Sequence, residues 1–579
     1  MNWNFLRHSW QRLLRYAFVG TALAIPTATP PLVAATYEVA QRHPQASDDG
    51  PGTRERPWQT LAKAAASVGP GDTVLIRGGV YRERLLIKAS GSSEAPIRFE
   101  AAPGEFVVLT GADRLTGWQR NDPDRPAYTI PWPHRFNTYS KTMTHPADAR
   151  HLAIGRCEQV IVNGYLLRQV LSAAQLAPGT FFADVTNQVL HIWDTANGDL
   201  AKAQVEGSVR QEVLRVEGEH VRLRGIHFRF AANQAQRGAV WLAGGHGVLE
   251  DCVIEDMNSS GATFAAEHLT VRRCAFRNNG QLGFSANRAH HLRFAGCLVE
   301  QNNVKNFDRG WEAGGNKLVL CRDAVLEHSR FLRNHGNGVW FDIGNEDCSV
   351  RNCLIADNED AGIFYEISFA LRAHDNVIVG NGFASTAGAW GAQAGISLSS
   401  SPNCVIERNL VVGNREGFNF REQLRSTRTI EDRKGRPVWN HDELIRNNII
   451  AFNRDAQIWG WFDVKDERHW PAGRQRIETD SKSKWNLENL KLRFEDNIYF
   501  AAPGQGEFRW GTTWARHRNY ATLEEFRSEL KIDAGSRVLD PSFADLASSD
   551  FRLNAEAPVE FQASYPRGAI PGVTLEKRE

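Results

Sequence analysis

Residues 274–302 read CAFRNNGQLGFSANRAHHLRFAGCLVEQN, and this stretch decides the fold. Cys274 and Asn279 recur 23 residues later as Cys297 and Asn302. A unit of this length that repeats along a chain buries its apolar face by stacking on its neighbours. The stretch therefore predicts a solenoid whose coils take 22–24 residues where no insertion lengthens them.

Both positions continue along the chain as columns with a constant offset of five residues. The first column comprises Cys252, Cys274, Cys297, Ser329, Cys353, Asn376, Asn409, Asn448 and Asn497. The second comprises Asn279, Asn302, Asn334, Asn358, Asn381, Asn414 and Asn453. Helical repeats have longer units, and the Leu-x-x-Leu-x-Leu pattern of leucine-rich repeats is missing. Parallel strands stacked about 4.8 Å apart would turn such columns into ladders. The pattern therefore predicts an all-β, right-handed parallel β-helix.

The cysteines of the first column are expected to be thiols. Eight cysteines in an exported protein would ordinarily suggest disulfides. Equivalent cysteines on consecutive coils approach disulfide distance, but their place in a buried ladder favours small apolar side chains.

The two ends of the repeat and one interruption complete the predicted organisation. Trp58–Val68 has the composition and period of a helix, which would cap the open end of the solenoid. Residues 119–208 break the repeat and contain Asn163-Gly164, Pro178-Gly179 and Asn197-Gly198, which predict hairpin turns in a β-rich insertion. The predicted parts are a signal peptide (1–35), an N-terminal cap with the first coils (36–118), the insertion (119–208), the main β-helix (209–505) and a closing segment (506–579).

The first 35 residues are expected to direct secretion. Arg7, Arg12 and Arg15 precede an apolar, acid-free stretch that starts at Tyr16 and ends in small residues before Thr36. Retention as an uncleaved anchor is the alternative. No other run approaches the roughly 20 apolar residues of a spanning helix. We therefore expect a secreted or periplasmic bacterial protein, monomeric and without a membrane span once the signal is removed.

The charge of the chain excludes one class of partner. Removal of residues 1–35 takes away three arginines and no acid, so the formal charge falls from +1 to −2. A near-neutral chain lacks the electrostatic footprint of a nucleic-acid-binding protein. We expect no nucleic-acid partner.

A family resemblance rests on the two ends of the chain and on the coils between them. Residues 36–83 and the Asn-bearing coils resemble the pectate-lyase-like superfamily of right-handed β-helix proteins. Residues 540–553, Asp-Pro-Ser-Phe-Ala-Asp through Asp-Phe-Arg-Leu, resemble the closing segment of its bacterial extracellular members. The resemblance covers most of residues 36–555 and implies the fold, with carbohydrate processing as the commonest activity; a fold alone does not fix the chemistry. The catalytic signatures of polygalacturonases, typical pectate lyases and related epimerases are missing, so no catalytic residue is carried over.

One outward column carries the candidate catalytic residues. The second strand of each coil opens with glycine, and strand alternation sends every other residue after it outward. Aligned in this way, the column is expected to read Asn287, Lys317, Asp342, Glu366, Ser399, Arg421 and Asp463, with the register of Lys317 open by one residue.

Asp342 and Glu366 are the centre of this hypothesis. They are 24 residues apart, which is one coil, so their Cβ atoms should lie about 5 Å apart. Carboxylates that close resist ionising together unless a cation intervenes. The pair suits a general acid beside a nucleophile or base, a calcium site, or a salt-bridge row with Lys317 and Arg421. The separation matches retaining glycosidases, but rotamers could reach the roughly 6.5–9.5 Å of inverting enzymes. Glu312 and Asp463 are further acids near the pair.

Aromatic and polar side chains around the pair are expected to bind a sugar. Trp340, Phe364, Trp459 and Trp461 point outward on the same face, and Trp311 and Trp390 lie on adjoining loops. Asn287, Ser399 and Asn419 would supply hydrogen bonds. The alternative is that the aromatic side chains pack beneath the long insertions on this face, 303–315, 382–394, 422–445 and 464–493.

Three functions fit this pattern, each with a polysaccharide or oligosaccharide as partner. The leading one is a secreted glycoside hydrolase in which Asp342 and Glu366 are the catalytic pair. The second is a polysaccharide lyase, in which Lys317 or Arg421 abstracts a proton from a uronic acid and the acids hold calcium. The third is a non-catalytic glycan-binding protein or adhesin. No His or Cys spacing indicates a metal site, and no cofactor besides calcium is implied.

Overall fold

The computed structural model describes residues 34–120, 127–136, 155–193, 200, 202–385, 393–422, 430–436, 438, 440–462, 491–512, 516–545 and 550–553. These residues belong to one compact unit, Ala34–Glu579. The predicted signal peptide lies outside them except for its last two residues, so it stays a prediction. In the described part of the chain, no helix is long and apolar enough to cross a membrane.

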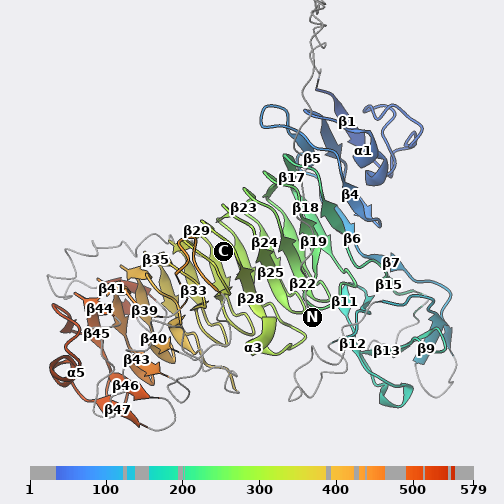
Figure 1. Cartoon of the computed structure of the whole chain (residues 1–579). Coiled ribbons are helices and arrows are strands. Elements are labelled where there is room, and N and C mark those ends of the chain that lie inside the picture. The colour runs from blue at the N-terminus through green and yellow to red at the C-terminus, as the bar shows by residue number, and fades with distance from the viewer. Residues whose placement is uncertain are drawn as a thin grey trace, which may run out of the picture. The chain divides into compact units, whose positions relative to one another are not determined.

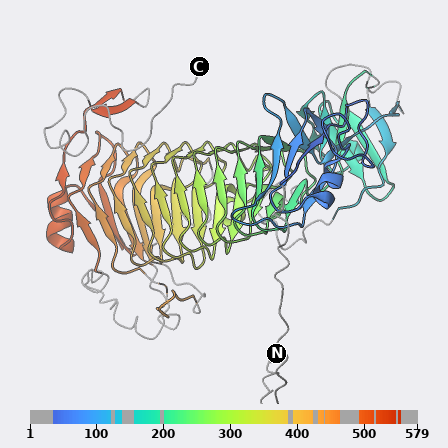
Figure 2. The same ribbon diagram turned by 90° about the horizontal axis from the view of Figure 1, so that it is seen from above.

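The described coils form three long sheets of thirteen strands each, stacked coil upon coil (Figures 1 and 2). Sheet 1 comprises β4 (Leu85–Ile87), β16 (Leu214–Val216), β19 (Gly238–Leu242), β22 (Ser260–Phe264), β25 (Leu282–Asn287), β28 (Gly314–Val319), β31 (Val339–Asp342), β34 (Ile363–Glu366), β37 (Ala394–Ser399), β40 (Glu416–Glu422), β43 (Ala456–Phe462), β46 (Phe508–Thr512) and β47 (Arg516–Tyr520). Its neighbours pair in parallel, except that β47 runs antiparallel to β46.

The other two sheets are parallel throughout. Sheet 2 comprises β1 (Thr36–Val39), β2 (Thr73–Ile76), β5 (Ile97–Ala101), β17 (Val221–Arg224), β20 (Val248–Glu250), β23 (Thr270–Arg272), β26 (Arg293–Ala295), β29 (Val325–Glu327), β32 (Ser349–Arg351), β35 (Arg372–His374), β38 (Val405–Glu407), β41 (Leu444–Arg446) and β44 (Arg493–Glu495). Sheet 3 comprises β3 (Gly79–Tyr81), β6 (Val107–Thr110), β18 (Ile226–Arg229), β21 (Val253–Glu255), β24 (Ala275–Arg277), β27 (Leu298–Glu300), β30 (Arg330–Leu332), β33 (Leu354–Ala356), β36 (Val377–Val379), β39 (Leu410–Val412), β42 (Ile449–Ala451), β45 (Ile498–Phe500) and β48 (Arg537–Val538). The predicted parallel β-helix is confirmed.

The Asn columns form hydrogen-bonded ladders at the corners between the sheets. Asn302 Nδ2 donates to Asn334 Oδ1 at 2.9 Å and to the Phe276 carbonyl at 3.0 Å. Each ladder residue follows a residue with a positive φ, such as Gln301 at 53° and Arg333 at 51°. That left-handed corner interrupts the strand ladder, and the Asn side chain supplies the hydrogen bonds that the backbone loses there.

The cysteines of the first column are buried inside the same corners. All eight cysteines of the chain are described and buried, and no disulfide joins any two of them. Cys274 N–H lies 3.4 Å from Cys297 Sγ, so sulfur takes the acceptor place that an Asn oxygen takes in later coils. The expectation of thiols is confirmed.

Both ends of the coil stack are covered. The helix α1 (Leu61–Ser67) falls within the predicted segment, begins at the N-cap Thr60 and buries Leu61, Ala64 and Ala65. At the other end lies α5 (Leu523–Leu530), which the sequence analysis did not anticipate. Its Phe526 ring stacks 4.9 Å from the Phe508 ring of the last coil. The closing segment then forms a hairpin of β49 (Phe543–Asp545) and β50 (Asp550–Leu553).

The region predicted as a β-rich insertion forms two small sheets with a hydrophobic core of its own. One contains β7 (Ala112–Arg114), β10 (Val160–Val162), β11 (Tyr165–Leu166) and β15 (Val205–Ser208); the other contains β8 (Gln119–Arg120), β9 (Ala127–Pro131), β12 (Arg168–Gln169), β13 (Thr180–Asp184) and β14 (Val189–Trp193). The boundaries of the predicted parts stay predictions.

The hairpin turns predicted in this insertion have three different outcomes. Asn163-Gly164 joins the antiparallel strands β10 and β11 as predicted. Pro178-Gly179 does not make a hairpin, because the strands on either side of it, β12 and β13, pair in parallel. Asn197-Gly198 lies outside the described residues.

Candidate active site on the outward face of sheet 1

The register of sheet 1 defines two columns of side chains that alternate with the core. The core column Leu318, Phe341, Tyr365, Leu398 and Phe420 is fully buried between them. The first outward column contains Ser285, Lys317, Trp340, Phe364, Ser397, Asn419, Trp459 and Arg509. The second contains Asn287, Val319, Asp342, Glu366, Ser399, Arg421 and Trp461.

Asp342 and Glu366 are direct neighbours in the second outward column. Their Cα atoms are register partners of β31 and β34, as the ladder spacing predicts. Parallel strands hold such partners about 4.8 Å apart. Both side chains are largely buried, at 7% and 5% relative exposure. The two carboxyl groups therefore share one small, poorly solvated region.

Lys317 does not occupy the predicted place in the column. The residue paired with Asp342 is Val319, and Lys317 lies two positions earlier, in the first outward column. Its Nζ nevertheless reaches Asp342 Oδ2 at 2.9 Å and Glu312 Oε1 at 3.7 Å. Gly315 lies in register with Gly283 and Gly338, so the fourth residue after it, Val319, takes the place in the column, whereas Lys317 is only the second.

These charges set the protonation of the site. Burial alone would lower the pKa of Lys317, but the carboxylates of Asp342 and Glu312 outweigh it and raise that pKa above its usual value. Burial raises the pKa of Glu312, and the negative charge of Asp342 adds to that rise while Lys317 opposes it. Lys317 is therefore a fixed cation, and Glu312 is a carboxyl group that takes up protons readily.

The helix α3 (Arg309–Glu312) carries Glu312 to the pair and lies beside β28 (Figure 1). Asp308 caps it by accepting a hydrogen bond from Gly310 N at 2.9 Å. Arg309 ties it to a neighbouring coil through ion pairs to Glu359 at 3.0 Å and Asp360 at 3.1 Å. The insertion thus brings a third carboxyl group within 3.7 Å of the Lys317 ammonium.

Trp340 and Phe364 point outward as predicted but are buried, and their role as sugar platforms stays a prediction. Both are only 2% exposed, and their rings stack on one another with centroids 5.7 Å apart. Strand alternation correctly gives their outward direction but does not tell whether the outer face is covered. Trp340 Nε1 donates to Glu366 Oε1 at 3.1 Å, so the indole positions a carboxyl group.

A cation lies against each end of this aromatic pair. Lys317 Nζ is 4.1 Å from the centre of the Trp340 ring, and the Arg421 guanidinium carbon is 5.4 Å from that of Phe364. Arg421 is fully buried and follows Ser399 in the second outward column. Cation–π contacts of this kind strengthen when they are desolvated. Glu366 therefore bonds to an indole that belongs to an aromatic pair flanked by two buried cations.

The other predicted site residues differ in whether they are buried, exposed or outside the described residues. Ser399 and Asn419 are buried in the outward columns next to Arg421 and Ser397. Asn287 belongs to the second column but is exposed and accepts a hydrogen bond from Arg288 at 2.9 Å. Trp459 is partly buried, with the Arg509 guanidinium 4.9 Å from its ring centre. Asp463 and Trp390 lie outside the described residues, as do the side chains of Trp311 and Trp461.

Two buried polar residues of sheet 1 were missed by sequence reasoning. Glu416, at the start of β40, is buried, and burial raises its pKa to about 7. Its Oε2 accepts a hydrogen bond from Asn419 Nδ2 at 2.6 Å. Gln393 immediately precedes β37 and is also buried. Strict alternation would place Glu416 on the core side of β40 with Phe418 and Phe420, so the sequence pattern gives no signal for a polar role of Glu416.

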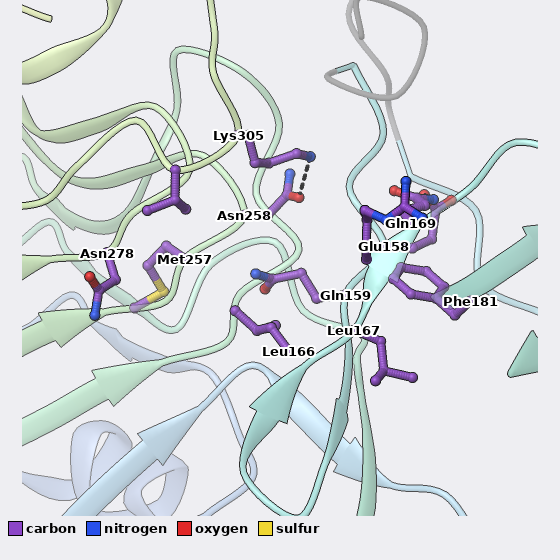
Figure 3. A pocket seen from close by; sticks show the side chains of 12 residues that line it. Glu158, Gln159, Leu166, Leu167, Gln169, Phe181, Met257, Asn258, Asn278 and Lys305 are labelled. Atoms are coloured by element: carbon purple, nitrogen blue, oxygen red, sulfur yellow. Dashed lines mark hydrogen bonds between the residues drawn. The ribbon is translucent and has the colours of Figure 1, made fainter. Parts of the chain in front are cut away.

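A separate hollow lies between the insertion and the coils (Figure 3). It holds about 280 Å³ and is lined by Leu166, Phe181 and Met257 among others. At its edge Lys305 Nζ donates to Asn258 Oδ1 and to the Arg156 carbonyl, both at 2.8 Å. Burial lowers the pKa of Lys305 to about 8. Lys305 thus joins the insertion to the coils and does not belong to the outward columns that contain Asp342.

Among the described residues, no group of three or more His, Cys, Asp or Glu is placed to hold a metal ion.

Comparison with known proteins agrees with this architecture. Residues 237–411 match the family model described as "Right handed beta helix region". The solved structure described as "The complex structure of XylC with xylose" has a TM-score of 0.64 at 17% identity and covers 88% of this chain and 87% of its own. The chain thus has the right-handed parallel β-helix fold that its repeats predict.

Two curated relatives differ in how much of the chain they match. The uncharacterized protein YwoF of Bacillus subtilis (strain 168) is 24% identical over 544 residues, 89% of this chain and 90% of that protein. Pectate lyase PEL9 of Emericella nidulans is 34% identical over 86 residues, 14% of this chain and 20% of that protein. The match to YwoF spans most of both chains, but no activity is named for that protein. The match to PEL9 names an activity but covers only 20% of that enzyme.

Proposed function

We propose that this chain is an exported glycoside hydrolase that retains anomeric configuration, with Asp342 as nucleophile and Glu366 as general acid and base. The observation that carries the proposal is the register pairing of the two carboxyl groups on adjacent strands. Carboxyl groups about 5 Å apart fit a double-displacement mechanism, in which one attacks the sugar directly. The xylose in the XylC complex and the activity named for PEL9 support a carbohydrate as substrate.

The surroundings of the two carboxyl groups assign their roles. Asp342 Oδ2 is ion-paired with the Lys317 ammonium at 2.9 Å, which holds the carboxyl group in one orientation. Asp342 Oδ1 is buried and has no hydrogen-bond partner among the described residues, so it is the oxygen we assign to the attack. Glu366 accepts a hydrogen bond from the neutral indole of Trp340. A neutral donor allows that carboxyl group to gain and lose a proton during the reaction.

The reaction follows in two balanced steps. Glu366 donates its proton to the glycosidic oxygen while Asp342 Oδ1 forms a bond to the anomeric carbon, and the bond to the leaving group breaks. Glu366, now ionised, takes a proton from water, whose oxygen attacks the same carbon and releases Asp342. Two inversions restore the original configuration, and one water is consumed.

The lyase alternative requires a base that the geometry does not favour. Abstraction of a proton by Lys317 needs a neutral amine, whereas Asp342 and Glu312 raise the pKa of Lys317 and keep it protonated. The same ion pair engages the acid that would have to hold calcium. The hydrolase is therefore the better reading of this site.

A glycan screen tests the proposal. Purified protein is incubated with a panel of glycans with and without a chelator, and both reducing ends and the absorbance of unsaturated uronates are followed. We expect reducing ends without unsaturated product, and the substrate's anomeric configuration in the first product seen by NMR. Asp342→Asn should abolish turnover, whereas Glu327→Gln, an acid paired with Arg351 on sheet 2 at 2.5 Å, should not. Unsaturated product would identify a lyase, and glycan binding without turnover a non-catalytic protein.

A further inference from the structure

Another hollow lies in the N-terminal cap, at the end of the stack that carries β1 and α1 (Figure 1). It holds about 340 Å³ and is bounded by the residues that follow β1, by Arg54 and by the turn from β2 to β3. Its charged lining consists of Arg42, Arg54, Arg77 and a single acid, Glu38, with His43 beside them. A hollow lined mainly by one sign of charge concentrates ions of the opposite sign, so this one attracts anions.

Two of the three arginines have side chains available for a ligand. Arg42 and Arg54 are exposed, and within the described part of the chain neither side chain takes part in an ion pair or a hydrogen bond. By contrast, Arg351 of sheet 2 is ion-paired with Glu327 at 2.5 Å. One unpaired arginine on a surface is ordinary. Two that line the same hollow beside a third guanidinium bring several N–H donors to one place.

The other two donors of the hollow are held by neighbouring groups. Arg77 forms ion pairs with Glu105 at 2.5 Å and with Glu38 at 3.7 Å, which fix its guanidinium at the wall of the hollow. His43 Nδ1 accepts the Gln45 N–H at 3.2 Å, so the neutral ring carries its proton on Nε2 and donates from there. The hollow therefore combines two fixed donor groups with two arginines that are free to adjust.

The number and arrangement of these donors indicate the chemistry of the ligand. A carboxylate has two oxygen atoms in one plane, and one guanidinium fork can bind both. A phosphate group has at least three strong acceptor oxygens that point in different directions, so each can accept from a different donor. Three guanidinium groups and an imidazole N–H around one hollow therefore fit a phosphate group better than a carboxylate.

We propose that Arg42, His43, Arg54 and Arg77 bind a phosphate group, carried either by a soluble phosphate ester or by the headgroup of an anionic lipid. The inference goes beyond the proposed function and does not depend on it. The hollow lies at β1 and β2 of sheet 2, whereas the carboxyl pair lies on β31 and β34 of sheet 1. The two sites can therefore be tested separately.

Binding of defined phosphate probes to the purified protein tests the site and the source of the phosphate. Calorimetry at low ionic strength is run with inorganic phosphate, with glycerol 3-phosphate and, as a carboxylate, with glucuronate. Sedimentation is run with vesicles of phosphatidylglycerol and, as the control without net charge, of phosphatidylcholine. We expect the phosphate probes to bind at least about tenfold more tightly than glucuronate. Added salt should weaken this binding, because the charges are exposed to solvent.

Variants of the lining residues should shift the affinity in opposite directions. Arg42→Gln and Arg54→Gln should each weaken phosphate binding about tenfold, the effect of one lost charge-assisted hydrogen bond. Glu38→Gln should tighten it, because this change removes the acid that lines the hollow. Arg56→Gln is the matched control, since Arg56 is an exposed arginine two residues beyond Arg54 that does not line the hollow.

The outcomes assign the source of the phosphate or overturn the site. Binding of the soluble phosphates that is weakened in Arg42→Gln supports an ester, and such binding of phosphatidylglycerol vesicles alone supports a lipid headgroup. Binding that Arg42→Gln and Arg54→Gln leave unchanged, glucuronate binding as tight as phosphate binding, or no binding of any phosphate probe overturns the site. Both arginine side chains are exposed and unbonded, so these variants should keep the native thermal unfolding midpoint. A loss of binding is then not a loss of folding.

Discussion

The corner ladders and the outward face of sheet 1 are both rows of buried polar side chains on the same coils. In the ladders an Asn bonds its counterpart on the next coil and a strand carbonyl of the preceding coil, as Asn334 does with Asn358 and Val299. On the outward face Asp342, Ser397 and Asn419 each keep one polar atom without a partner in the described part of the chain. Buried polar groups are thus paired within the fold in the first region, and in the second we propose that they serve ligand chemistry.

The largest expected effect is on the rate of hydrolysis, and it comes from substitutions of the proposed catalytic pair on the outward face of sheet 1. Glu366→Ala and Asp342→Ala should each lower the hydrolysis rate by at least about 10³-fold, because each removes a group that acts in the transition state. Added azide separates their roles. It should give a glycosyl azide of retained configuration with Glu366→Ala and of inverted configuration with Asp342→Ala, as read by NMR.

Glu312 is the matched control for this prediction. Its pKa is raised by burial, which suits an acid, but it contacts the pair through Lys317 and not through the strand register. Glu312→Gln should therefore keep activity within about tenfold of the native protein. A loss as large as that of Glu366→Ala, with azide rescue, would move the general acid to α3.

The ladder variant should show the opposite pattern, losing stability and not chemistry. Asn334→Ala removes the bonds to Asn358 and Val299 and leaves Asn302 without its acceptor. The cost should be about 3 kcal/mol in the free energy of unfolding, measured by urea denaturation. The rate of the folded enzyme should be nearly unchanged. Asn287→Ala, which loses only an exposed contact, should stay within about 0.5 kcal/mol of the native protein.

Glu416 should make part of the stability depend on pH. Burial raises its pKa to about 7, whereas the unfolded chain ionises it near 4.5. The folded protein thus holds an extra proton between these values, and raising the pH through this window costs stability. The Glu416→Gln variant cannot titrate at this position. As the pH rises from 4.5 to 7, the unfolding free energy of the variant minus that of the native protein should therefore increase by up to about 3 kcal/mol.

Glu407 on sheet 2 provides a control of opposite sign. Burial would raise its pKa, but hydrogen bonds and charges from Arg446 and Arg408 outweigh burial and lower it. Its ion pairs therefore stabilise the protein above the unfolded pKa and are lost as the pH falls. As the pH rises, the unfolding free energy of Glu407→Gln should fall relative to that of the native protein. A parallel response in both variants would contradict the assignment of Glu416 as a buried neutral acid.

The smallest expected effect is that of a reductant on thermal stability, which should be zero. Since no disulfide joins the eight cysteines, a reductant should leave the thermal unfolding midpoint unchanged. Thiol titration of the denatured protein should count eight reactive groups. A midpoint that falls on reduction would show that the cysteine column oxidises on export.

The corner ladders were predictable from sequence because their spacing is a property of the chain itself. Cys274, Cys297 and the Asn residues that follow recur at intervals that only stacked coils explain. The same spacing placed Asp342 beside Glu366 correctly. Lys317 was placed wrongly because it follows the aligned Gly315 by two residues, whereas Asp342 follows Gly338 by four.

The covering of the outward face was not predictable in the same way. Alternation tells which side of a sheet Trp340 and Phe364 face, but their burial depends on contacts far apart in sequence. The stack of His220, His246, His268 and His291, with ring centroids 4.5–4.8 Å apart, was missed although it recurs at the coil spacing. Each of these residues has a positive φ, a turn position that the search for Asn and Cys passed over.

The corner amides also make the scaffold indifferent to loop length. Asn279 and Asn302 are 23 residues apart and bond at 2.9 Å, and Asn448 and Asn497 are 49 residues apart and bond at 3.0 Å. Since each ladder amide bonds only to the adjacent coils, as Asn302 does to Asn334 and Phe276, a segment inserted between two coils need not change the ladder contact. Insertions can therefore change the loops around the outward face while the carboxyl pair stays in place. Under the proposed function, related chains could change their glycan preference in this way without a change of fold.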